Sequence, residues 1–99
     1  MLYAISGIDV PNSLANRVAS RSAHLARITE LQDQGRLVLA GPHPIPDTPD
    51  PGQAGFSGSL IVAEFPSLIE AEAWARLDPY VDSGVWREVI VKPFVQVRP

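Results

Sequence analysis

His24 and Asp78 are the two residues of this sequence best placed to move a proton. His24 lies on the polar edge of a helical pattern, and Asp78 stands where Pro79 breaks a second one. An imidazole takes up and releases protons near neutral pH, and a carboxylate within hydrogen-bond reach fixes its tautomer and makes it a better general base. The sequence therefore predicts a His–Asp acid/base pair, provided that folding brings the two residues together.

Two arginines accompany the histidine. On an uninterrupted helix, positions 17, 21, 24, 28 and 31 share a narrow sector, so Arg17 and Arg21 would flank His24. Guanidinium groups bind anionic or phenolic oxygens through paired hydrogen bonds. The alternative is that both arginines lie along the helix surface and His24 is an ordinary boundary residue, and spacing alone favours it.

Asp78 also has an alternative role. Asp at an N-cap followed by Pro at the first helical position begins a short helix, here over 79–83. The capping role and the catalytic role are compatible, because one carboxylate can accept several hydrogen bonds.

Other polar and aromatic residues are weaker candidates. Ser59 opens a strand and can offer a hydroxyl, and Tyr80 can line a pocket for an aromatic ring, although both also suit purely structural roles. His43, between two prolines, is expected to face solvent. We expect no metal and no cofactor: the chain has no cysteine, no HExxH helix and no cluster at ligand spacing. The glycines at 52, 55 and 58 precede a strand and not a helix, so they do not form a phosphate-binding loop.

Apolar periodicity and turn residues divide the chain into elements that would position these side chains. The long helix is expected to bury Leu14, Val18, Leu25, Ile28 and Leu31, and Ser20 to Ser22 leave open whether it is one piece or two. A Ser67–Glu70 capping box opens the second helix. We expect strands over 2–9, 36–40 (buried), 56–65 and 85–97, helices over 13–34 and from 67 to before 79, and an irregular loop over 42–55.

This order predicts one α+β domain, 1–99, with the ferredoxin-like βαββαβ (split βαβ) fold: an antiparallel sheet with two helices on one face. The other sheet face needs a cover, so we expect a homodimer. The net charge of −3 argues against a nucleic-acid partner, and the central strands lack the basic and aromatic residues of RNA-binding sheets. No apolar stretch is long enough for a membrane span, so a cytoplasmic location is expected.

A series of short motifs runs along nearly the whole chain: Arg21-x-x-His24-Leu25, Gly35-Arg36-Leu37, Ala40-Gly41-Pro42, Ala54-Gly55-Phe56-x-Gly58-Ser59, Ala63-Glu64-Phe65, Ala73-Trp74-Ala75, Asp78-Pro79-Tyr80, Gly84-Val85 and Val91-Lys92-Pro93-Phe94. Together and in this order they resemble the YciI-like family. The resemblance implies a dimeric α/β-barrel protein with an active site centred on a histidine and an aspartate, which correspond to His24 and Asp78. The family includes a dehydrochlorinase acting on a chlorinated hydroxyhydroquinone, and the wider superfamily includes muconolactone isomerase-like enzymes.

Two functions remain in view. The first is a cofactor-independent lyase or isomerase, in which His24 and Asp78 remove a proton from a small cyclic, anionic or phenolic substrate. Arg21 would steady the developing negative charge, and Arg17, Ser59 and Tyr80 would help to bind the substrate. The alternative is a non-catalytic homodimer that binds a small molecule in the same pocket.

Overall fold

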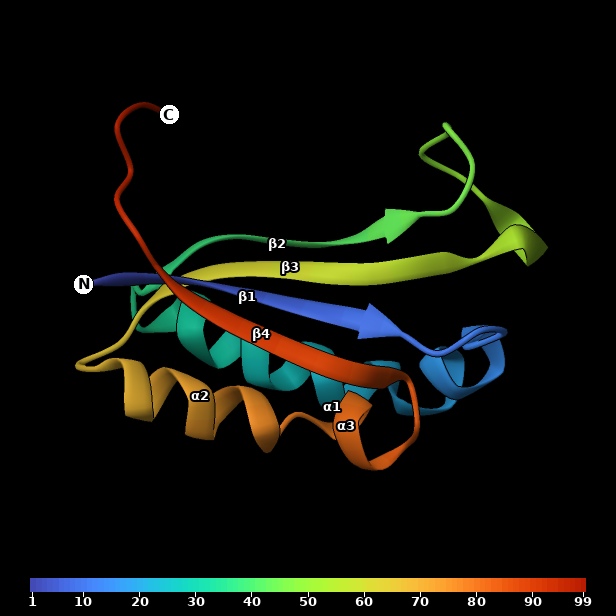
Figure 1. The fold of residues 1–99 in the computed structure, drawn as a ribbon, viewed down its shortest axis with the longest axis horizontal. Helices are drawn as coiled ribbons and strands as arrows, with labels where there is room; N and C mark the ends of the chain where they lie inside the picture. The colour runs from blue at the N-terminus through green and yellow to red at the C-terminus, as the bar shows by residue number, and fades with distance from the viewer.

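Four antiparallel strands form one sheet, and all the α-helices lie on one of its faces (Figure 1). The computed structural model describes residues 1–99. Across the sheet the strands run in the order β2-β3-β1-β4, which is the ferredoxin-like arrangement that the sequence predicted. The elements are β1 (Leu2–Asp9), α1 (Leu14–Asp33), β2 (Leu37–Pro44), the 3-10 helix η1 (Gly52–Ala54), β3 (Phe56–Glu64), α2 (Leu68–Arg76), α3 (Pro79–Asp82) and β4 (Trp86–Phe94).

The core lies between the sheet and the helices. Side chains alternate in β1, so that Tyr3 and Ile5 are buried beneath the helices while their neighbours in the strand face the other side. β3 has the buried apolar centre expected of it, Ile61 to Ala63. Because β1 and β3 are the two central strands, the backbone of each is paired with a neighbouring strand on both edges.

Helix α1 is one unbroken helix, but its buried stripe is only partly the predicted one: Ile28 and Leu31 are buried as expected, and Val18 and Leu25 are not. Val18 and Leu25 are 68% and 38% exposed, whereas Arg17 and His24 are 6% exposed and lie on the same face as the buried Ile28 and Leu31. The prediction placed the stripe by apolarity alone. The helix instead turns two polar residues inward, because partners on other elements satisfy their hydrogen bonds.

The ends of α1 are fixed by different means. Ser13 is the N-cap residue, but its hydroxyl donates to Oδ2 of Asp9 (2.6 Å) and does not cap the helix. At the other end Gly35 adopts a positive φ of 70°, and the N–H groups of Gly35 and Arg36 bond back to Gln32 and Leu31. This Schellman motif stops the helix where the sequence predicted.

Strand β2 differs from the prediction of a short buried strand that ends at Gly41-Pro42. It continues to Pro44 and most of it is exposed. β2 is an edge strand, so one of its two sides has no neighbouring strand. Pro42, which lies opposite Ser59 of β3, has no N–H to donate, and the strand tolerates it because the open side needs no hydrogen bond. The predicted irregular loop is therefore shorter, and η1 forms within it.

The second half of the chain follows the prediction with small differences. Ser67 accepts the backbone N–H of Glu70 (3.2 Å), but the reciprocal bond of a capping box is absent. Helix α2 ends at Arg76 and leaves Leu77 exposed. β4 ends at Phe94 and not at Val97, and the last residues leave the sheet on the side away from the helices (Figure 1).

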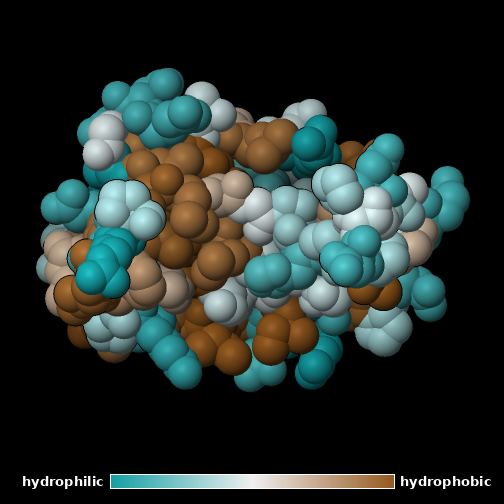
Figure 2. Space-filling model, turned by 90° about the horizontal axis from the view of Figure 1, so that it is seen from above, coloured by the Kyte–Doolittle hydropathy of each residue, from teal (hydrophilic) through white to brown (hydrophobic).

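The sheet face opposite the helices carries an apolar patch. Figure 2 shows this face, with hydrophobic residues gathered over one half of it. Leu39 of β2 and Phe94 of β4 are large exposed hydrophobic residues of the two edge strands. None of the helices is both long and apolar enough to cross a bilayer.

Candidate active site

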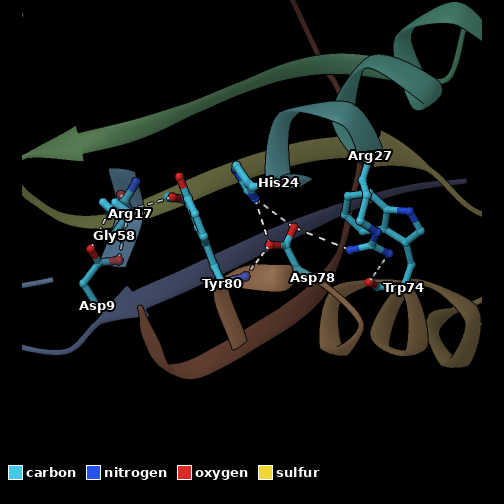
Figure 3. Close-up of polar contacts among 9 residues, drawn as sticks. Asp9, Arg17, His24, Arg27, Gly58, Trp74, Asp78 and Tyr80 are labelled. Atoms are coloured by element: carbon cyan, nitrogen blue, oxygen red, sulfur yellow. Dashed lines mark hydrogen bonds and ion pairs between the residues drawn. The ribbon is translucent and has the colours of Figure 1, made fainter. Parts of the chain in front are cut away.

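His24 and Asp78 form a direct, buried pair. Nδ1 of His24 lies 2.8 Å from Oδ1 and 2.9 Å from Oδ2 of Asp78, whose side chain is wholly buried (Figure 3). A carboxylate can only accept, so Nδ1 carries the hydrogen. Nε2 of the neutral ring is then the unprotonated nitrogen, and it has no hydrogen-bond partner within the chain. This is the tautomer that a general base requires.

Local structure places Asp78 under the histidine. Asp78 is the N-cap of α3, Pro79 occupies the first turn, and Oδ1 accepts the backbone N–H of Tyr80 (2.9 Å). Gly84, with a φ of 75°, ends α3 after a single turn. The carboxylate therefore has both roles that the sequence suggested, capping α3 and contacting His24.

Two aromatic rings fix the plane of the imidazole. Tyr80 stacks on His24 with centroids 3.9 Å apart and planes 9° from parallel. Trp86 meets both rings edge-on, at 5.7 Å from His24 and 5.6 Å from Tyr80. The indole fits because residue 7 of β1 is glycine: a Cβ there would lie 2.2 Å from the Trp86 ring. The imidazole therefore has little freedom to rotate away from Asp78.

A cavity of about 410 Å³ opens beside the pair, between α1 and the β2–β3 half of the sheet. Its volume suits a small ring compound. Both polar and apolar groups form its wall, and the lining residues are Arg17, Arg21, His24, Leu25, Ile28, Gln32, Leu37, Ala40, Gly41, Pro42, Ser59, Ile61 and Tyr80. All six residues named as site candidates thus belong to the cavity or to the carboxylate behind it.

Arg17 reaches the cavity wall through a buried network. Its Nε and Nη2 contact the two carboxylate oxygens of Asp9 at 2.6 and 2.9 Å, and Nη2 also donates to the Gly58 carbonyl (3.0 Å) and to Oγ of Ser59 (2.9 Å). The edge of the guanidinium that carries Nε and Nη2 is therefore occupied by hydrogen bonds within the protein. Because Ser59 accepts from Arg17, its own hydroxyl hydrogen is free to donate to a ligand.

Arg21 and Tyr80 complete the polar side of the cavity. Arg21 is exposed at the cavity wall and makes no hydrogen bond within the chain. Burial raises the pKa of the Tyr80 hydroxyl, and the positive charges of Arg17 and Arg21 oppose that shift. Tyr80 is therefore a neutral phenol at neutral pH and can donate a hydrogen bond.

Several residues of this region were not foreseen. Asp9 ends a strand, and nothing in its local pattern marks it as the partner of Arg17. Arg27 lies 3.5 Å from Asp78 and follows His24 by three positions, so helix periodicity could have placed it near the pair. His43, in contrast, is exposed as predicted and is not part of the cavity wall.

Comparisons with known proteins identify relatives that match nearly the whole chain. A family model described as the YCII-related domain matches residues 1–95. Protein YciI of Escherichia coli O6:H1 and that of Shigella flexneri are each 55% identical over 97 residues, covering 98% of this chain and 99% of the relative. An uncharacterized protein of Haemophilus influenzae is 50% identical over the same coverage.

A similar solved structure is that of an enzyme, 5-chloro-2-hydroxyhydroquinone dehydrochlorinase (TftG) from Burkholderia phenoliruptrix AC1100, in complex with 2,5-dihydroxybenzoquinone. It matches with a TM-score of 0.83 at 27% identity, over 96% of this chain and 94% of that one. The fold, the motifs and the family model lead to one assignment: the chain belongs to the family of proteins built on the YCII-related domain.

Proposed function

We propose that this protein is a cofactor-independent lyase or isomerase that removes a proton from a small cyclic substrate bearing an anionic or phenolic oxygen. The observation that carries the proposal is the His24–Asp78 contact, which leaves Nε2 of a buried, oriented imidazole unpartnered beside the cavity. The similar dehydrochlorinase acts on a substituted ring compound, which supports this substrate class.

The chemistry follows from the groups around Nε2. Nε2 accepts the substrate proton, and the resulting imidazolium is stabilised by the Asp78 carboxylate. The electron pair left on the substrate either expels a leaving group, which is elimination, or takes a proton at another atom, which is isomerisation. Arg21, with Ser59 and Tyr80 as hydrogen-bond donors, would stabilise the negative charge that develops on the ring oxygen.

The apolar part of the cavity suits the rest of a ring. Ile28 comes from α1, Leu37 and Pro42 from β2 and Ile61 from β3, so that hydrophobic side chains form part of the cavity wall beside the polar groups. A planar ring can lie against these side chains while its oxygens meet the donors.

A panel of catechols, hydroquinones and lactones tests the proposal, with turnover followed by absorbance and binding by calorimetry. Removing a general base lowers rates about 10²–10⁴-fold, so His24→Gln and Asp78→Asn should lose turnover while binding remains. The matched controls are His43→Gln and Asp82→Asn, because both residues are exposed and outside the cavity wall. Binding without turnover in the wild type would favour the alternative, a non-catalytic protein that binds a small molecule.

We also propose that two copies associate through the sheet face opposite the helices. The accessible surface of the chain is 6168 Å². A monomer of this mass is expected to expose about 5,500 Å², and the excess agrees with a face that lacks its cover. The apolar patch of Figure 2 lies on this face. A second copy offers the same patch, so a two-fold pairing would bury both at once.

Sedimentation measures this association. Leu39→Lys introduces a charge on an exposed leucine of edge strand β2, and we expect it to convert the dimer to a monomer. Leu77→Lys is the control, since Leu77 is also exposed but follows α2 in the helical layer. A wild-type protein that sediments as a monomer at micromolar concentration would contradict the dimer.

A further inference from the structure

Arg27 is a partly buried charge that the proposed reaction does not use. It lies on α1, one turn after His24, and its guanidinium reaches toward α2 and α3 (Figure 3). Nη2 donates to the Trp74 carbonyl (2.7 Å) and the guanidinium lies 4.2 Å from the centre of the Trp74 ring. Nη1 is buried without a hydrogen-bond partner, and it lies 3.5 Å from Oδ2 of Asp78.

This geometry places Asp78 between two groups that can be positive. His24 contacts both carboxylate oxygens, and Arg27 approaches Oδ2 from the other side (Figure 3). Burial lowers the pKa of Arg27 and the Asp78 charge opposes that shift, while an arginine remains charged in proteins. The negative charge of Asp78 is therefore already balanced when His24 is neutral.

We infer that Arg27 is a positioning residue that balances the charge of Asp78 and thereby lowers the proton affinity of His24. Without Arg27, the carboxylate would face only His24, and the imidazolium form would gain stability. With Arg27 present, the Asp78 carboxylate is already paired with a positive charge, and it orients an imidazole that is neutral. Its bond to Trp74 also ties the end of α2, and with it the turn that carries Asp78, to α1.

Other charged groups near the histidine are accounted for. Arg17 is paired with Asp9 of β1, and Arg21 is exposed to solvent, so both act on His24 less directly than Arg27 does through Asp78. The groups that face the pair are Arg17, Arg21 and Arg27 of α1, with Glu30 acting on Arg27, Asp78 and Tyr80 at α3, and the non-titrating Ser59 of β3 and Trp86 of β4.

The test is an NMR titration of the two histidines in the ligand-free protein, with His43→Gln used to assign the signals. Arg27→Gln removes the charge and keeps a donor for the Trp74 carbonyl, whereas Arg27→Lys keeps the charge and loses the planar fork. We expect the His24 midpoint to rise by about one pH unit in Arg27→Gln, a tenfold higher proton affinity. In Arg27→Lys the His24 midpoint should stay within about 0.3 pH unit of the wild-type value. Arg76→Gln, at an exposed arginine of α2, should leave it unchanged.

Two results would overturn the inference. One is an unmoved or lowered His24 midpoint in Arg27→Gln, and the other is an equal rise in the glutamine and lysine variants, which would assign the effect to the fork geometry and not to the charge. If the glutamine variant does not fold, the lysine variant decides, because a rise of about one unit there contradicts a role for the charge. The titration needs no substrate, so its outcome is independent of whether the proposed reaction is found.

Discussion

The Asp9–Arg17 pair offers a quantitative test of how the site is held together. The Asp9 carboxylate accepts from Arg17 Nε (2.6 Å), Arg17 Nη2 (2.9 Å) and the Ser13 hydroxyl (2.6 Å), and the side chains of the pair are 1% and 7% exposed. Asp9→Asn keeps the shape of the side chain, but it places an amide N–H₂ group against the donors of Arg17 and Ser13. It also leaves the positive charge of the Arg17 guanidinium without a negative partner. Breaking a buried ion pair from one side costs about 3–5 kcal/mol.

That cost is large for a domain of this size. Each kcal/mol lowers the melting temperature of a domain of up to 100 residues by about 4–8 °C, so Asp9→Asn should melt at least roughly 12 °C below the wild type. Urea unfolding at neutral pH gives the free-energy difference directly. The control is Glu72→Gln, which removes an exposed i,i+4 pair with Arg76 and should cost under about 0.5 kcal/mol.

A double substitution separates the charge from the shape. Asp9→Leu with Arg17→Met removes both charges, and we expect it to recover most of the stability lost in Asp9→Asn, since apolar pairs often replace buried ion pairs without loss. An Asp9→Asn variant that loses no more stability than Glu72→Gln, or a double variant less stable than the single one, would contradict the assigned role of the ion pair.

Two further predictions concern the aromatic residues of the site. Because burial raises the pKa of Tyr80 above that of the unfolded chain, the folded state binds more protons above about pH 10. Its stability should fall as the pH rises through that range, and Tyr80→Phe should show a smaller alkaline loss in thermal melts; an equal loss in both proteins would contradict this. Gly7→Ala should cost about 1–3 kcal/mol because its Cβ would meet Trp86 at 2.2 Å, whereas Gly41→Ala, with no atom within 4 Å, should leave the melting temperature unchanged. Equal melting temperatures for the two glycine variants would show that Trp86 moves aside freely.

Local sequence patterns predicted the elements and their limits well where the signal lies in the residues themselves. Gly35 stops α1 and Ser67 caps α2 as expected, because these conformations and hydrogen bonds involve only near neighbours in the chain. Pro42 misled the prediction of β2, since a proline is compatible with an edge strand and no local pattern tells an edge strand from a central one.

For the site, the sequence by itself determined which residues have proton-transfer chemistry and which share a helix face: His24 and Asp78 as the pair, with Arg17 and Arg21 beside the histidine. Only the tertiary structure decided their partners. It turned Arg17 inward onto Asp9 and set Arg27 behind Asp78. Helix periodicity fixes the direction of a side chain relative to its own helix, whereas the charge or carbonyl that it meets comes from strands and turns far along the chain.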